Sequence, residues 1–246
     1  MLTQSIGALC SDYYVNQKLS LKLDLPSARE SVLDMFDRVR RDLPAMDRFR
    51  RYEDELALES PEQDGVYNWL ALNKTAIRSG WVNPTEFPDA YRLHRLILEV
   101  APYFLSISPL DVDTLELMYG IDLEVARNRN EIVFEALFAG SPLHDIVTAE
   151  EPVVELQPNI GFALEAGCGT QAFLEIKTRT TAAEVAAGVF NAEPISVYMT
   201  VRTHGPFRSL EDLAAGFDAV SKAGERLVEN RVLPNVIQPL RAAISG

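Results

Sequence analysis

The chain has 246 residues, and its 47% hydrophobic content is enough to fill the core of one large domain or two small ones. Its 36 acidic side chains outnumber its 23 basic side chains and give a formal net charge of −13. This charge disfavours binding to nucleic acids and to anionic membranes, and it favours basic or neutral partners.

The cysteine count and the hydrophobic stretches place the chain in a cellular compartment. Cys10 and Cys168 form no metal-binding pattern and permit at most one disulfide. The N-terminus has neither the basic start nor the apolar run of a secretion signal. No apolar stretch approaches the roughly 18 residues that indicate a membrane span. We therefore expect a soluble, intracellular, cytoplasmic protein.

The first strand and helix are predicted near the N-terminus. Leucines alternate with polar residues from Leu19 to Leu25, which indicates a strand with one buried face. Ser27 and Glu30 have the spacing of a capping box, in which each residue bonds the other's backbone at a helix start. The helix that follows is predicted from apolar residues at helical spacing: Ala28, Val32, Phe36, Val39 and Leu43.

The next elements are a hairpin and a helix. The stretches "DELALES" (54–60) and "GVYNWLALNKTAIRS" (65–79) have strand character, and "PEQDG" (61–65) between them has turn chemistry. A strongly apolar helix is predicted within 85–107, and it should end or kink near Pro102. Its inward residues are Leu93, Leu96, Ile97 and Val100.

The same order of strand and then helix recurs in the rest of the chain. Alternating apolar residues predict strands over 115–125, 174–178 and 195–201. A short helix should follow the first of these at 128–138, and Thr181 with Glu184 forms a capping box after the second. Ser209 opens the last and longest helix, which prolines 234 and 239 should break.

Alternating strands are typical of antiparallel sheets, whereas parallel strands are continuously apolar. The sequence therefore predicts an α+β fold with a mainly antiparallel sheet of about seven or eight strands and helices on one face. The repeated order of elements suggests a diverged internal duplication. The halves would be residues 1–140 and 150–246, with a boundary near 139–154 and one continuous sheet shared between them.

The stretch Glu165-Ala166-Gly167-Cys168-Gly169-Thr170 resembles the glycine loop of class I S-adenosylmethionine-dependent methyltransferases. In those enzymes a helix must follow the glycines and point its N-terminus at the cofactor. Here the residues after Thr170 alternate as a strand, and residues 162–166 alternate before the glycines. We therefore interpret the stretch as a hairpin in which the glycines supply positive φ, with 160–166 and 171–179 pairing antiparallel.

Catalytic signatures are absent from the sequence. It contains no nucleophile elbow, no Walker loop and no His-Glu-x-x-His motif. Of the three histidines, His94 lacks a second ligand at helical spacing, and His144 has only Asp145 beside it in sequence. We expect no metal site, no catalytic residues and no cofactor.

One polar segment is a candidate ligand site. Arg202, His204 and Arg208 lie between a strand and the predicted start of the last helix, where free backbone N–H groups and the helix dipole favour an anion. A small anionic ligand or a partner's carboxylate would fit there. The alternative interpretation is that Arg202 is a solvent-facing strand residue and that Gly205-Pro206 is an ordinary turn.

Two functional hypotheses remain open. The first is a non-enzymatic acidic interaction protein, such as an adaptor, a chaperone-like protein or an immunity-type binder, that also self-associates. Its partner would be another protein or a second copy of itself. The second is a small-molecule-binding domain or enzyme whose anion-accepting pocket has Arg202, His204 and Arg208 at its mouth.

Overall fold

The computed structural model describes residues 2–26, 29–148 and 150–246. Its helices are α1 (Leu2–Gly7), α2 (Arg29–Asp42), α3 (Phe87–Phe104), α4 (Arg129–Phe138), α5 (Ala182–Ala187), α6 (Leu210–Leu227), the π-helix η3 (Val228–Ile237) and α7 (Gln238–Ser245). Its strands are β1 (Asp12–Leu21), β2 (Arg48–Arg51), β3 (Leu56–Glu59), β4 (Tyr67–Leu72), β5 (Ala76–Val82), β6 (Val112–Val125), β7 (Asn159–Ala163), β8 (Thr170–Lys177) and β9 (Glu193–His204).

The strands form one nine-stranded sheet in the order β2-β3-β4-β5-β1-β6-β9-β8-β7, and all neighbours pair antiparallel. The predicted α+β class is confirmed, with nine strands in place of seven or eight. Strands from both sides of the expected boundary at 139–154 meet where β6 pairs with β9. The division into halves 1–140 and 150–246 stays a prediction.

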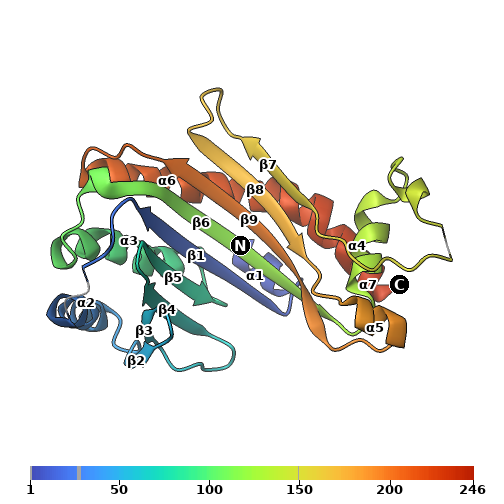
Figure 1. The fold of residues 1–246 in the computed structure, drawn as a ribbon, viewed down its shortest axis with the longest axis horizontal. Helices are drawn as coiled ribbons and strands as arrows, with labels where there is room; N and C mark the ends of the chain where they lie inside the picture. Colours follow the sequence, from blue (N-terminus) through green and yellow to red (C-terminus); the bar gives the residue numbers. More distant parts are fainter. Residues whose placement is uncertain (1, 27–28, 149) are drawn as a thin grey trace.

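Helices α3 and α6 cover one face of the sheet (Figure 1), where α6 contacts β6 and β9 and α3 contacts β1 and β5. The central side chain of this core is Tyr119 of β6. Its hydroxyl lies 2.6 Å from that of Tyr91 and donates to the Ser221 carbonyl at 3.0 Å. A Cβ at Gly224 of α6 would come within 2.2 Å of the Tyr119 ring, so glycine is required for the helix to approach this closely.

The N-terminal elements differ partly from the expectation. Strand β1 ends at Leu21, and Leu23 is 67% exposed, so the predicted strand over 19–25 extends too far. Helix α2 buries Val32, Phe36 and Val39 as predicted. The expected cap residue Ser27 and the first apolar residue Ala28 lie outside the described residues.

The hairpin region contains more strands than predicted. The pairing of β3 with β4 confirms the predicted hairpin. The stretch 65–79, expected as one strand, holds β4, a turn at 73–75 and the start of β5, which pair with each other. Strand β2 was not predicted, because three of its four residues are arginines and only Phe49 carries an apolar signal.

The prolines near the C-terminus do not interrupt the helical path. Pro234 lies inside η3, and Pro239 lies in the first turn of α7, which follows η3 without a break. The chain therefore stays helical from α6 to Ser245. Among the described residues, no helix is long and apolar enough to cross a membrane.

The glycine stretch at 165–170 joins two strands. Strands β7 and β8 pair with Ala163 opposite Gln171, and β8 continues as a strand to Lys177, so no helix begins at Gln171. The methyltransferase-like loop is therefore a hairpin, as expected. The residue with positive φ in it is Cys168, at +52°, which corrects the expectation that the glycines would supply this conformation.

His94 of α3 is fully buried and belongs to the core. Its Nδ1 lies 2.8 Å from the Ser79 hydroxyl of β5, and desolvation lowers the pKa of the imidazole from 6.5 to about 3. A neutral core histidine cannot take up a proton in the folded state until the pH falls to that value. This contact holds α3 against β5.

Acid should therefore destabilise the fold through His94. The unfolded imidazole protonates below pH 6.5 and the folded imidazole does not until about pH 3, so stability is present above pH 6.5 and is lost as the pH falls through this window. Urea unfolding should show a loss of about 2 kcal/mol between pH 7 and pH 5 that is absent from His94→Gln. An equal loss in the variant would contradict this assignment.

Candidate functional site: the open face of the sheet

The face of the sheet opposite α3 and α6 is turned toward the viewer in Figure 1, and no helix crosses it in the described part of the chain. Side chains alternate along strands, so the residues next to the core positions point to this face. We call it the open face. Its central residues are Tyr67 and Trp69 of β4, Arg78 and Gly80 of β5, Tyr14, Asn16 and Lys18 of β1, Glu116, Met118, Gly120 and Asp122 of β6, Ser196, Tyr198, Thr200 and Arg202 of β9, Phe173, Glu175 and Lys177 of β8, and Gly161 of β7.

Large aromatic side chains on the open face lie over glycines of the neighbouring strand. The directly paired residues are Trp69 with Gly80, Tyr14 with Gly120, and Phe173 with Gly161. A Cβ added at the glycine would come within 2.5, 2.1 and 2.9 Å, respectively, of the paired ring. Each ring therefore occupies the space of the missing side chain and lies flat against the backbone, as in the rescue of strand glycines by aromatic partners.

The aromatic rings are also paired with cations. The Arg78 guanidinium lies 6.0 Å from the Trp69 ring centre, that of Arg202 lies 4.9 Å from the Phe173 ring, and the Lys177 ammonium lies 5.5 Å from the Tyr198 ring. These are distances at which a cation is attracted to an aromatic ring.

Each of these cations also has a carboxylate partner. Arg78 pairs with Glu55, Arg202 donates to Glu116 at 2.8 Å, and Lys177 lies 3.4 Å from Glu175. The open face therefore carries three groups of one ring, one cation and one carboxylate. The charges within each group balance, which leaves a surface rich in aromatic and arginine side chains with little net charge.

A hydrogen-bonded cluster continues the open face toward one end of the sheet. Arg179 donates to the Ser196 hydroxyl at 2.7 Å and to the Tyr198 hydroxyl at 3.0 Å. The Tyr14 ring lies 6.4 Å from that of Tyr198, and its hydroxyl lies 3.4 Å from an Asp122 carboxylate oxygen. These side chains come from β1, β6, β9 and the end of β8, so the sheet register brings them together.

Burial shifts the ionisation of this cluster. Burial raises the pKa of Asp122, and the Ser196 hydroxyl and Arg179 oppose this rise. Burial, followed by the charge of Asp122, raises the pKa of Tyr14. A phenol with a raised pKa stays neutral at physiological pH, so Tyr14 serves as a hydrogen-bond donor and not as a base.

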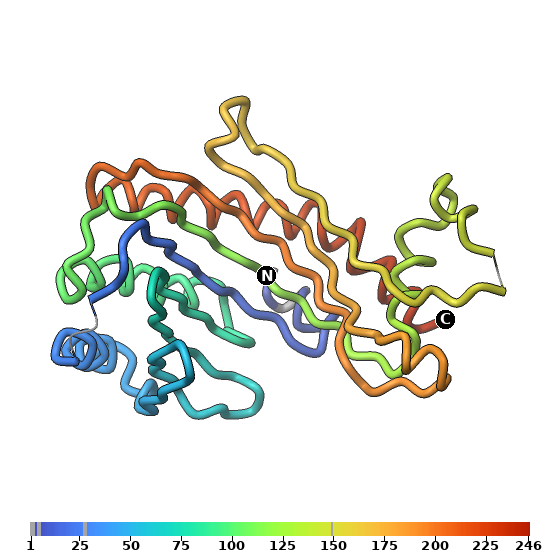
Figure 2. Tube along the Cα trace, viewed as in Figure 1, coloured from blue at the N-terminus to red at the C-terminus, as the bar shows by residue number. Residues whose placement is uncertain are grey.

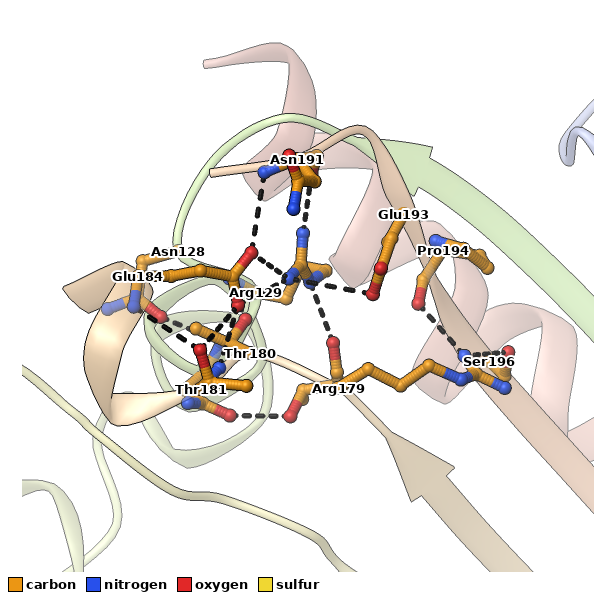
Figure 3. A network of polar contacts seen from close by, with 12 residues as sticks. Asn128, Arg129, Arg179, Thr180, Thr181, Glu184, Asn191, Glu193, Pro194 and Ser196 are labelled. Atoms are coloured by element: carbon orange, nitrogen blue, oxygen red, sulfur yellow. Dashed lines mark hydrogen bonds and ion pairs between the residues drawn. The ribbon is translucent and has the colours of Figure 1, made fainter. Parts of the chain in front are cut away.

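Arg129 holds the strand ends behind this cluster (Figure 3). Its side chain is fully buried at the start of α4 and donates to the carbonyls of Thr178 and Asn191, both at 2.7 Å. It also contacts the Glu184 carboxylate at 3.2 Å and lies 3.9 Å from that of Glu193. One guanidinium therefore ties α4, the end of β8, α5 and the start of β9 together.

The backbone next to this clamp directs Arg179 onto the open face. Arg129 fixes the Thr178 carbonyl, and Arg179 follows with a φ of +55°, which is strained for a residue with a side chain. From this position the Arg179 side chain also reaches the Pro194 carbonyl at 3.1 Å, as Figure 3 shows. The buried clamp therefore positions an arginine of the candidate site.

The residues proposed from the sequence lie in different surroundings. Arg202 belongs to the open face, with Glu116 and Phe173 as its neighbours. His204 is exposed at the end of β9, and Arg208 is exposed before α6. Among the described residues, no hydrogen bond or ion pair connects the side chains of the three.

The start of α6 is already occupied by groups of the chain itself. The Ser209 hydroxyl accepts a hydrogen bond from the Asp212 N–H, and the Asp212 carboxylate accepts one from the Arg208 N–H at 2.9 Å. Glu211 is a second acidic residue in the first turn, and hydrogen bonding to its own backbone N–H lowers its pKa. These carboxylates hold the place that an anionic ligand would take.

The large cavities lie away from the centre of the open face, although Glu55, the partner of Arg78, borders one of them. One of about 660 Å³ is bordered by α2, β2 and β3, and another of about 590 Å³ lies between α4 and the C-terminus. Arg202, His204 and Arg208 are not in the lining of either cavity. In the described residues, His, Cys, Asp and Glu side chains form no group of three or more that would hold a metal ion.

Comparisons with known proteins give no relative: no family model matches the chain, and no curated protein matches its sequence.

The glycines under the aromatic rings should be required for stability. Gly120→Ala places a methyl group within 2.1 Å of the Tyr14 ring and should lower the free energy of unfolding by about 2 kcal/mol, because the ring must leave its position. In a Tyr14→Ala background the same change should cost much less. Denaturant unfolding of Gly167→Ala, where nothing lies within 4 Å of the added Cβ, gives the control.

Replacing Arg129 should loosen the end of the sheet that carries Arg179. Arg129→Met leaves two buried carbonyls without donors and should lower the free energy of unfolding by about 3 kcal/mol. The matched variant is Arg127→Met, which changes an exposed arginine two residues away and should cost well under 1 kcal/mol. Equal stability of the two variants would contradict the role of Arg129.

Proposed function

We propose that this protein is a non-enzymatic, self-associating interaction protein of the cytoplasm, which binds a protein partner through the open face of its sheet. The observation that carries the proposal is the set of aromatic rings on the open face: Trp69, Tyr14 and Phe173 lie over glycines, and Trp69, Phe173 and Tyr198 each have a paired cation. Tyrosine, tryptophan and arginine are the residues that dominate the binding energy of protein interfaces. Rings already held flat lose little conformational entropy on binding, which favours their use as contact residues.

The charge of the open face indicates what kind of partner it fits. The chain as a whole carries −13, but Arg78, Lys177 and Arg202 of the open face are each paired with a carboxylate. The net charge of the whole molecule repels acidic proteins at long range. A partner whose docking surface mixes apolar and polar groups and carries little net charge does not experience this repulsion, and it matches the open face. We therefore propose a folded protein with a nearly neutral docking surface.

The second hypothesis, a pocket for a small anion at Arg202, His204 and Arg208, receives less support. Arg202 is paired with Glu116, and the backbone donors near Arg208 bond Asp212. An anion would have to displace both carboxylates. Thermal denaturation with and without phosphate separates the hypotheses, since stabilisation that is lost in Arg202→Ala/His204→Ala/Arg208→Ala would support the pocket.

The docking proposal is tested by replacing open-face rings. The partner is first captured from the native host with the wild-type protein, identified and purified, and its affinity is then measured by calorimetry. Phe173→Ala/Tyr198→Ala should weaken binding about tenfold or more, because truncation of central aromatic contacts has effects of this size.

The control is Tyr103→Ala, which removes an aromatic side chain of α3 that is 74% exposed and lies away from the open face. This variant should bind as the wild type does. Unchanged affinity of Phe173→Ala/Tyr198→Ala, with its fold intact by circular dichroism, would refute docking on the open face.

A further inference from the structure

The edge strand β2 forms a basic surface on this acidic protein. Between Arg38 and Arg51 the chain has six arginines against two aspartates. All four residues of β2 are exposed, and its three arginines, Arg48, Arg50 and Arg51, take part in no ion pair among the described residues. Unpaired positive charge is therefore concentrated on one edge of the sheet.

The backbone of β2 is also available. The strand pairs with β3 on one side and is the last strand of the sheet, so every second residue directs its N–H and C=O outward. Phe49 of β2 is 51% exposed, although its ring lies 5.8 Å from that of Phe36. The edge thus offers backbone hydrogen bonds, positive charge and one exposed aromatic ring.

A segment with the opposite character precedes the other edge strand, β7. From Asp145 to Glu155 the chain has four acidic residues and no basic residue. Glu150, Glu151 and Val154 are exposed, Val154 to 50%, and residues 152–158 have no regular secondary structure. A hydrogen bond from the Thr148 backbone lowers the pKa of Glu151, which keeps this carboxylate charged.

The basic edge and the acidic segment lie toward opposite ends of the molecule. In Figure 2 the trace through residues 48–51 lies at the lower left, and residues 150–155 lie at the far right. The sheet order agrees, because β2 and β7 are its two outer strands. The two surfaces cannot meet within one chain, but they can meet between two copies.

We propose that residues 150–155 of one copy dock along β2 of a second copy, so that the protein associates head to tail. The carboxylates of Glu150, Glu151 and Glu155 would face the three β2 arginines, which suit carboxylates in geometry and charge. Val154 would contact Phe49. Glu150 and Glu151 lie in a turn, and the four residues that follow, 152–155, would span roughly 13 Å when extended, which matches the four residues of β2.

Head-to-tail contacts of this kind leave one basic edge and one acidic segment free at the ends of each assembly, so growth continues unless a ring closes. The contact is small and charged, and association should therefore be weak and should weaken further with salt. This inference develops the self-association in the proposed function, but it uses neither the open face nor its partner. Either can fail without the other.

Sedimentation equilibrium at low ionic strength tests the proposal with two sets of charge reversals. Variant A carries Arg48→Glu, Arg50→Glu and Arg51→Glu, and variant B carries Glu150→Lys, Glu151→Lys and Glu155→Lys. The wild type should show an average mass that rises with concentration, and each variant alone should stay monomeric. Equal amounts of A and B should associate again, because the native acidic segment of A faces the native β2 of B and the two reversed surfaces also carry opposite charges.

A chain with all six changes should associate again, since its charges are exchanged. Lys222→Glu/Arg226→Glu, which changes exposed residues of α6, should associate as the wild type does. The proposal is overturned if the wild type stays monomeric at every concentration, or if A or B associates alone. A monomeric wild type that binds polyglutamate or single-stranded DNA through β2 would assign the edge to another partner.

Discussion

The structure depends on one constraint, which is that nine strands form a single sheet while the helices pack on only one of its faces. The covered face is a conventional apolar core with Tyr119 at its centre. The other face must remain ordered without a second layer. Aromatic rings over glycines achieve this, because each ring covers backbone that would otherwise be bare, and two of the three, Trp69 and Phe173, are themselves covered by a cation.

The same constraint explains the buried arginine at the end of the sheet. Strands β6 and β8 end there, and β9 begins there. Among the described residues, no helix packs across the open face to hold the loops that follow β6, follow β8 and precede β9. Arg129 holds them instead, with its donors directed to backbone carbonyls and to Glu184. A buried guanidinium is stable only when its N–H groups have hydrogen-bond partners. The loops that provide these partners are therefore held in one position relative to each other. That arrangement places Arg179 beside Tyr198.

The sequence was sufficient to predict those strands and helices that have a clear local pattern of apolar or capping residues. Alternation identified β6, β8 and β9, and the Thr181–Glu184 capping box marked α5 correctly. The turn between β4 and β5 was missed because residues 73–75 contain neither glycine nor proline. Strand β2 was missed because it is mostly charged, so it lacks the alternating apolar residues by which the other strands were recognised.

The candidate site was largely hidden from the sequence, because it depends on register between distant strands. Tyr14 meets Gly120 across 106 positions, and no local pattern pairs them. Arg202 drew attention because His204 and Arg208 are near it in sequence, yet its contacts come from β6 and β8. Glycines inside alternating strands were the available signal, since a strand glycine often marks a close approach by another group.

The central claim is that a partner covers the open face, and Trp69 reports on it directly. The chain has two tryptophans, and Trp81→Phe leaves Trp69, which lies on the open face, as the sole tryptophan. Acrylamide quenching of its fluorescence should be efficient in the free protein and should fall when the captured partner is added at saturating concentration. Quenching that is unchanged in the complex would contradict the account.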